Sequence, residues 1–188
     1  MIETPIKTAL VLFLVFSLPQ SVSASDYAAD TEGGHAYIQF KISHLGLSRL
    51  AGRYSRFSGD FSYDENNPSA ATIEVVIDTR SIDSNHAECD WHVRDEDFLN
   101  VAASPEARFF SRSFNGHGEG KAALVGDLTL RGVTRPVRIE VDHVGEGTDP
   151  WGGYRHGFSG KTRIVLADYA LVRAADPDRM GEAHSALS

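Results

Sequence analysis

The stretch ALVGDLTLRGVTRPVRIEV, residues 123–141, carries the clearest structural pattern in this chain. Every second residue of its first half falls on one mainly apolar face: Leu124, Gly126, Leu128 and Leu130. A period of two is typical of a strand with one buried face and one solvated face. The alternation breaks at Gly132, which can adopt positive φ, and it resumes after Pro136 with Val137, Ile139 and Val141. The stretch therefore predicts a β-hairpin with one apolar face and one wet face.

Five further segments alternate in a similar way and are predicted strands: 35–44, 53–63, 72–78, 108–114 and 154–166. Residues 45–52 are expected to form a connection, and Gly59 inside a strand indicates a sharp bend or a bulge. Strands joined mostly by short turns favour an antiparallel up-and-down meander, which hides its edges by closing into a barrel. A barrel of about eight strands leaves an interior wide enough for side chains or one small ligand.

Residues 85–100, NHAECDWHVRDEDFLN, interrupt the strand pattern with a charged segment that does not alternate. We expect one or two short helices here, with Asp83 as the N-cap and Pro105 as a late stop. Phe98 and Leu99 would hold this insertion against the mouth of the barrel.

The first 24 residues have the features of a secretory signal peptide. Lys7 precedes the apolar run Ala9 to Phe16, which is too short to cross a bilayer core of about 30 Å. Val22-Ser23-Ala24 is a small-residue cleavage site. We therefore expect an exported protein.

Composition excludes some classes of partner and leaves others open. The chain has 188 residues and a net charge of −8, so nucleic acid is not an expected partner. Cys89 is the single cysteine and cannot form an intramolecular disulfide. It is either a free thiol or a site of intermolecular pairing, so a homodimer stays open as an alternative.

The inward faces of the predicted strands supply a set of apolar cavity candidates: Phe40, Ile42, Phe57, Phe61, Ile77, Phe109, Leu128 and Phe158. A solid core is the alternative, and the residues alone do not exclude it. Small residues at inward positions would leave room that a solid core would fill: Gly59, Ser111, Gly126 and Gly160.

Polar residues in and near the helical insertion are the candidates for metal binding, ligand head-group contacts or catalysis. His86, Cys89 and His92 are spaced three apart, but a helix turns about 100° per residue, so His86 and His92 point apart and no metal site is expected. Asp90 is expected to cap or pair, and His92 to bond a backbone group. His44 and His92 are candidates for contacts with a ligand head group. The sequence shows no nucleophile elbow, no phosphate-binding glycine loop and no converging pair of carboxylates, so no catalytic residues are assigned.

Several ordered motifs together resemble one known family. They are FKISHLG at 40–46, FSGDF at 57–61, TRSIDSN at 79–85, GDLTLRGVTRPV at 126–137 and DPWG at 149–152. Between Asp26 and Tyr169 the chain resembles the YceI-like family of exported proteins. The resemblance implies a mainly β, lipocalin-like barrel whose elongated apolar pore holds an isoprenoid chain, such as a polyprenyl lipid or a quinone. It implies a periplasmic or secreted carrier with no cofactor besides this ligand, and not an enzyme.

The end of the chain departs from that pattern. Residues 172–188, VRAADPDRMGEAHSALS, do not alternate and contain Pro177. We expect a barrel domain at 25–171 and an atypical tail at 172–188. The final closing strand would then be missing, with a gap between strands 154–166 and 35–44.

The leading hypothesis is a periplasmic binding or carrier protein for a long isoprenoid lipid or quinone. One alternative is a metal-dependent or redox enzyme that uses His86 and His92. Another is a partner that hands quinone to a membrane electron-transfer protein.

Overall fold

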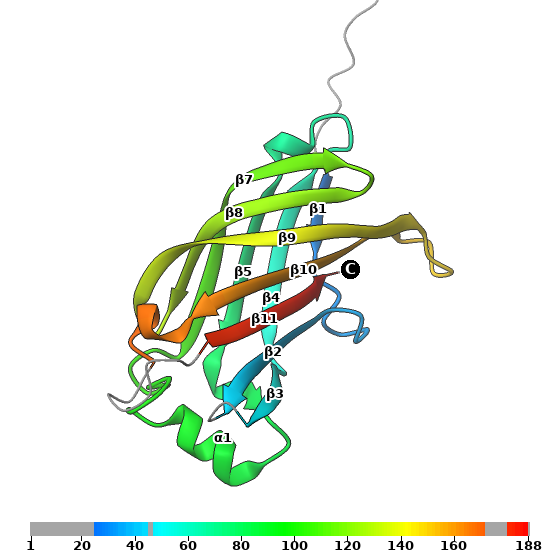
Figure 1. The fold of residues 1–188 in the computed structure, drawn as a ribbon. Coiled ribbons are helices and arrows are strands. Elements are labelled where there is room, and N and C mark those ends of the chain that lie inside the picture. The colour runs from blue at the N-terminus through cyan, green and yellow to red at the C-terminus, as the bar shows by residue number, and fades with distance from the viewer. Residues whose placement is uncertain (1–24, 45–46, 172–179, 188) are drawn as a thin grey trace, which may run out of the picture.

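The computed structural model describes residues 25–44, 47–171 and 180–187, which form a mainly β, lipocalin-like antiparallel barrel with one short α-helix (Figure 1). In the described residues, no helix has the length and apolarity needed to cross a bilayer. The fold class predicted from strand alternation is therefore correct, apart from its last strand.

The strands are β1 (Ser25–Ala28), β2 (Tyr37–His44), β3 (Ser48–Tyr54), β4 (Phe57–Tyr63), β5 (Thr72–Asp78), β6 (Ile82–Asp83), β7 (Glu106–Gly118), β8 (Lys121–Leu130), β9 (Val133–Thr148), β10 (Tyr154–Val165) and β11 (Met180–Leu187). The helices are α1 (Ala87–Arg94) and the 3-10 turns η1 (Pro68–Ala70), η2 (Thr79–Ser81) and η3 (Leu166–Tyr169). The strands form one curled sheet in the order β1-β4-β5-β7-β8-β9-β10-β11-β2-β3-β6, with every pair antiparallel.

The predicted central hairpin is β8 and β9, joined by a two-residue turn. Arg131 and Gly132 both have positive φ, 50° and 74°, as a type I′ hairpin requires. Arg131 is not glycine, and its guanidinium donates to the carbonyls of Glu96 (2.7 Å) and Ala170. These bonds tie the turn to the segment after α1 and to the end of η3.

The second predicted strand proves to be two strands separated by a corner. β3 occupies most of the expected connection, and the chain breaks at Ser55 and Arg56 before β4. Both amides turn toward Ser81, which accepts them at its carbonyl (3.1 Å) and its hydroxyl (3.0 Å). The register of β4 on β5 is continuous through Gly59. A bulge at Gly59 is therefore wrong, and the break between strands lies at the Ser55–Arg56 corner instead.

The expected gap in the barrel is also wrong, because β11 pairs with both β10 and β2. Thr162 of β10 stands opposite Ala183, and Ala183 stands opposite Phe40 of β2. The two flanking strands would otherwise each present unpaired backbone N–H and C=O groups. Main-chain hydrogen bonds satisfy these groups without alternating large side chains, which is why side-chain pattern alone missed this strand. Pro177 lies outside the described residues.

The helical insertion is shorter than predicted and begins elsewhere. The N-cap of α1 is His86, whose Nδ1 accepts from the amide of Cys89 at 3.3 Å. Asp83, the predicted N-cap, instead pairs with Arg53 at 3.1 Å and accepts from the amide of Asn85 at 3.0 Å. Leu99 is 5% exposed, in line with its expected role of holding this segment to the barrel.

Candidate functional site

The interior of the barrel contains two adjoining apolar cavities, of about 380 and 150 Å³. The larger one, here the lower cavity, lies against α1, and the smaller one, the upper cavity, lies further from it. Three residues line both of them: Ile38, Ile77 and Leu128. These residues form a waist between the two cavities, and the two cavities with their waist are together called the tunnel.

The upper cavity is surrounded by the middle strands of the sheet. Apart from the waist, its larger apolar lining residues are Phe61, Ile73, Val75, Phe109, Phe114, Leu124, Val137, Ile139, Val141 and Phe158. Register explains their convergence, because residues directly opposite in an antiparallel pair share a face. Phe109, for example, stands opposite Val75 on one side and Leu128 on the other.

Side chains of α1 and of the segment that follows it line one end of the lower cavity. His92, Val93, Phe98 and Leu99 line this end. The lower cavity also has the more polar wall, which contains Gln39, Ser43, Tyr54, Cys89 and His92. Burial raises the pKa of Tyr54 to about 12, so its hydroxyl stays protonated and can donate a hydrogen bond.

The described lining residues of both cavities include no Asp, Glu, Lys or Arg. An ionic group buried in such a cavity would lack a partner, at a large desolvation cost. The chemistry of the tunnel therefore suits a long uncharged apolar molecule, with any polar group placed in the lower cavity.

All but one of the predicted cavity residues lie at this tunnel. Phe40 and Ile42 line the lower cavity, Phe61, Phe109 and Phe158 the upper one, and Ile77 and Leu128 the waist. Phe57 does not line either cavity but packs against the core cluster beside them. Whether these side chains contact a ligand stays a prediction.

Two of the small residues expected to leave room have other roles. A Cβ on Gly126 would overlap the carbonyl oxygen of Phe110 and the ring of Phe109, so this glycine permits a close approach of strands and leaves no space. Ser111 accepts the amide of Ile73 at 2.8 Å. Gly160 does line the upper cavity, as expected for an inward position without a side chain.

The histidines of the insertion are separated in the structure. His86 caps α1, while His92 lines the lower cavity with its ring 5.0 Å from that of Phe98. In the described part of the chain, His92 packs on this ring and bonds no backbone group, contrary to the prediction. The side chain of His44, the other candidate for a head-group contact, lies outside what the structure describes.

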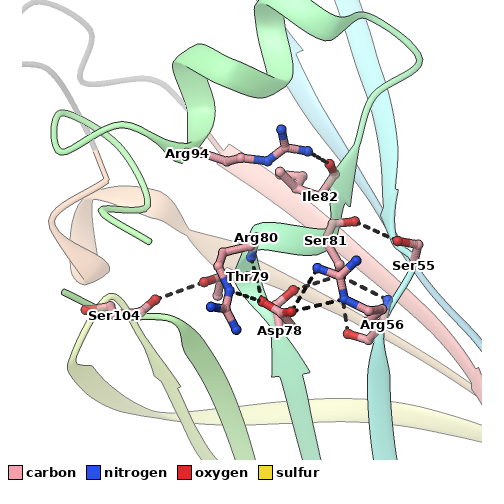
Figure 2. A network of polar contacts seen from close by, with 9 residues as sticks. All are labelled: Ser55, Arg56, Asp78, Thr79, Arg80, Ser81, Ile82, Arg94 and Ser104. Atoms are coloured by element: carbon pink, nitrogen blue, oxygen red, sulfur yellow. Dashed lines mark hydrogen bonds and ion pairs between the residues drawn. The ribbon is translucent and has the colours of Figure 1, made fainter. Parts of the chain in front are cut away.

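A polar network holds α1 in place over the lower cavity (Figure 2). Arg94 of α1 donates to the carbonyl of Ile82 at 2.6 Å. Asp90, 8% exposed, accepts the amide of Ser84 at 2.8 Å, in agreement with the predicted capping or pairing role. The middle and the C-terminal end of the helix are thus fastened to β6 and to the residue that follows it.

The same network fixes the corner between β3 and β4 beneath the helix. Asp78 accepts from Arg80 at 2.9 Å and from Arg56 at 2.9 Å (Figure 2). These hydrogen bonds lower the pKa of Asp78 to about 2, and the bond with Arg80 has the largest effect. Thr79, which is fully buried, donates to the carbonyl of Ser104 at 2.9 Å.

Sequence reasoning missed several residues of the lower cavity, among them Leu50 and Tyr54 of β3. Leu50, Gly52 and Tyr54 do alternate with more exposed residues, which is the signal of a strand. The signal is weak because its central member is a glycine. The ring of Phe40 occupies the space that a side chain at Gly52 would need.

The comparisons with known proteins agree with this architecture. A family model described as the YceI-like domain matches residues 27–184. A UPF0312 protein of Shewanella sp. (strain ANA-3) is 53% identical over 159 residues, covering 85% of this chain and 83% of the relative. Among solved structures, Burkholderia cenocepacia BcnA matches with a TM-score of 0.75 at 17% identity, covering 85% and 99% of the two chains. A polyisoprenoid binding domain from Saccharophagus degradans, implicated in plant cell wall breakdown, matches with a TM-score of 0.58 at 15% identity, covering 87% and 97%.

Proposed function

Because this chain belongs to the YceI-like family, we propose that it binds a long isoprenoid, a polyprenyl lipid or an isoprenoid quinone, inside its barrel. The observation that carries the proposal is the tunnel of two cavities with an apolar lining and no formally charged side chain among its described residues. The similarity of fold to a polyisoprenoid binding domain supports the same ligand class.

The energetics favour a long chain over a compact ligand. Each CH₂ group moved out of water is worth about 0.8 kcal/mol, so an isoprenoid of several units gains enough to offset its ordering cost. The larger cavity, about 380 Å³, falls within the range of roughly 300–1,000 Å³ typical of small-molecule sites.

A polar head group would lie in the lower cavity. Gln39, Ser43, Tyr54 and His92 offer hydrogen-bond donors and acceptors there, whereas the upper cavity is lined almost entirely by hydrocarbon. A quinone carbonyl or a prenyl alcohol could accept from the Tyr54 hydroxyl. Release past α1 would require this helix to move, since its residues line this end of the lower cavity.

We propose a carrier and not an enzyme, exported to the periplasm by the leader at residues 1–24. The alternative of a metal or redox enzyme built on His86 and His92 loses support, since the first caps α1 and the second faces the lower cavity. Transfer of quinone to a membrane electron-transfer protein remains compatible with this role, and a pull-down from solubilised membranes would test it.

The experiment that tests the proposal is extraction of the protein purified from its own host. Native mass spectrometry should show an adduct, and solvent extraction should release a polyprenyl lipid or a quinone. Added polyprenols or quinones should raise the melting temperature of delipidated protein. Protein that is free of lipid when isolated, and whose melting temperature ignores both ligand classes, would contradict the proposal.

A further inference from the structure

Three side chains near the end of the barrel away from α1 form a cluster that the isoprenoid proposal does not use. His143 and Glu146 come from β9 and His156 comes from β10 (Figure 1). Their donor atoms all lie within 4.8 Å of one another. The Glu146 carboxylate oxygen Oε2 is 3.1 Å from His156 Nδ1 and 3.4 Å from His143 Nε2.

A β-bulge explains why these residues converge. In a regular strand, residues three apart face opposite sides, so His143 and Glu146 should point apart. The pairing of β9 with β10 shifts here: Gly157 stands opposite Gly145, but Phe158 stands opposite His143. Val144 is therefore the extra residue of a bulge, and it is 72% exposed. The bulge turns His143 to the same side as Glu146, which stands directly opposite His156.

The two imidazole nitrogens that face Glu146 have unmet bonding capacity. Both His143 Nε2 and His156 Nδ1 are buried and have no hydrogen-bond partner in the described part of the chain. His156 as a whole is only 2% exposed. The short separations from Glu146 are thus not aligned hydrogen bonds, although buried polar atoms are nearly always satisfied. An ion along the nitrogen lone pairs would satisfy both nitrogens and the carboxylate together.

We propose that His143, Glu146 and His156 bind a divalent transition metal, with Zn²⁺ as the best match. Two imidazoles and one carboxylate are ligands that zinc accepts, with bonds of roughly 2.0–2.2 Å. Tetrahedral ligands at such bond lengths lie roughly 3.4 Å apart, close to the separations of Glu146 from both histidines. Three protein ligands leave one coordination position open.

A carboxylate and three aromatic rings surround His156 on the sides that do not face the cluster. The carboxylate of Glu65 lies 3.7 Å from His156 Nε2, on the other side of the ring from Glu146. A carboxylate there favours the tautomer that leaves Nδ1 free to ligate a metal. Rings of Tyr27, Tyr63 and Tyr154 lie 5.0–5.3 Å from the His156 ring and wall the site.

The test is zinc binding by the untagged chain, since a polyhistidine tag would itself bind metal. Protein stripped with EDTA is titrated with ZnCl₂ by calorimetry, and Co²⁺ is used as a visible probe of tetrahedral geometry. We expect one zinc per chain and intense cobalt absorption bands. Glu146→Gln and His143→Gln should each weaken zinc binding by at least the roughly 10- to 100-fold that follows when a hydrogen-bond partner of a metal ligand is removed. His117→Gln, at an exposed histidine outside the cluster, is the matched control and should bind as the parent does.

The metal-free melting temperature of each variant shows whether it folds, so a loss of binding can be assigned to the site. His156 is left unchanged because its burial makes misfolding a competing explanation. Failure of the parent to bind stoichiometric zinc would overturn the proposal. So would zinc binding that Glu146→Gln and His143→Gln leave intact. Neither outcome depends on whether the barrel binds an isoprenoid.

Discussion

A larger side chain at the waist should divide the tunnel. Leu128 lines both cavities together with Ile38 and Ile77, so Leu128→Trp would place an indole ring where the cavities meet. A long polyprenol such as octaprenol should then be confined to the lower cavity. Farnesol, a short isoprenoid, should still fit there and bind nearly as it does in the parent protein.

The size of the effect follows from the volume that the long ligand loses. The upper cavity measures about 150 Å³. An empty apolar cavity costs a protein core about 24 cal/mol per Å³, and the same coefficient applied to the ligand atoms that would fill this cavity gives about 3.6 kcal/mol. That free energy corresponds to a loss of roughly 400-fold in affinity for octaprenol. The same substitution should change farnesol affinity by less than about tenfold.

The assay is a competition for a fluorescent polyene ligand, with both isoprenoids titrated against the parent and the variant. Leu128→Met keeps the volume nearly constant and serves as the matched control, since such swaps usually cost under about 1.5 kcal/mol. The melting temperature of the unliganded variants reports any overpacking, which is expected to cost about 1–3 kcal/mol. Equal losses for octaprenol and farnesol in a folded Leu128→Trp protein would refute a tunnel that runs through the waist.

Four further predictions concern stability and closure. Gly126→Ala should lower the free energy of unfolding by about 1–3 kcal/mol because a Cβ there overlaps atoms of the neighbouring strand. Gly116→Ala is the control and should not lower it, since open space surrounds Gly116. Equal melting temperatures for the two variants would contradict this prediction. Asp90→Ala should leave the half-buried amide of Ser84 without its acceptor, at a cost of about 1–3 kcal/mol, and should speed isoprenoid dissociation measured by stopped flow. Hydrogen bonds lower the pKa of Asp30 from 3.8 to about 2, so the ionised carboxylate stabilises the fold at neutral pH. This contribution to the free energy of unfolding is lost as the pH falls between these two values. Acid titration of the Asp30→Asn variant should lack this loss of stability. Hydrogen exchange should find protected amides across residues 180–187, and rapid exchange there would argue against β11 as the closing strand.

The local pattern of apolar and polar residues was sufficient to predict strands and their inward faces wherever side chains alternate strongly. The hairpin of β8 and β9, its turn at Gly132 and most of the tunnel lining follow from period two, because inward residues must be apolar. Pattern failed at β3, where Gly52 interrupts the alternation so that Phe40 can fill its place. Side-chain pattern failed again at the start of α1, where a histidine ring nitrogen forms the N-cap hydrogen bond that a Ser, Thr, Asp or Asn side chain usually forms.

The sequence by itself determined the fold class, the family and the apolar character of the barrel interior, since all three depend on residue order and alternation. Only the tertiary structure decided which strands meet, that β11 joins β10 to β2, and that the interior divides at Ile38, Ile77 and Leu128 into two cavities. The same holds for His143, Glu146 and His156, whose spacing of three and ten along the chain predicts no shared face. They converge because of a bulge and a cross-strand register, which are backbone pairings between strands and leave little trace in local side-chain pattern.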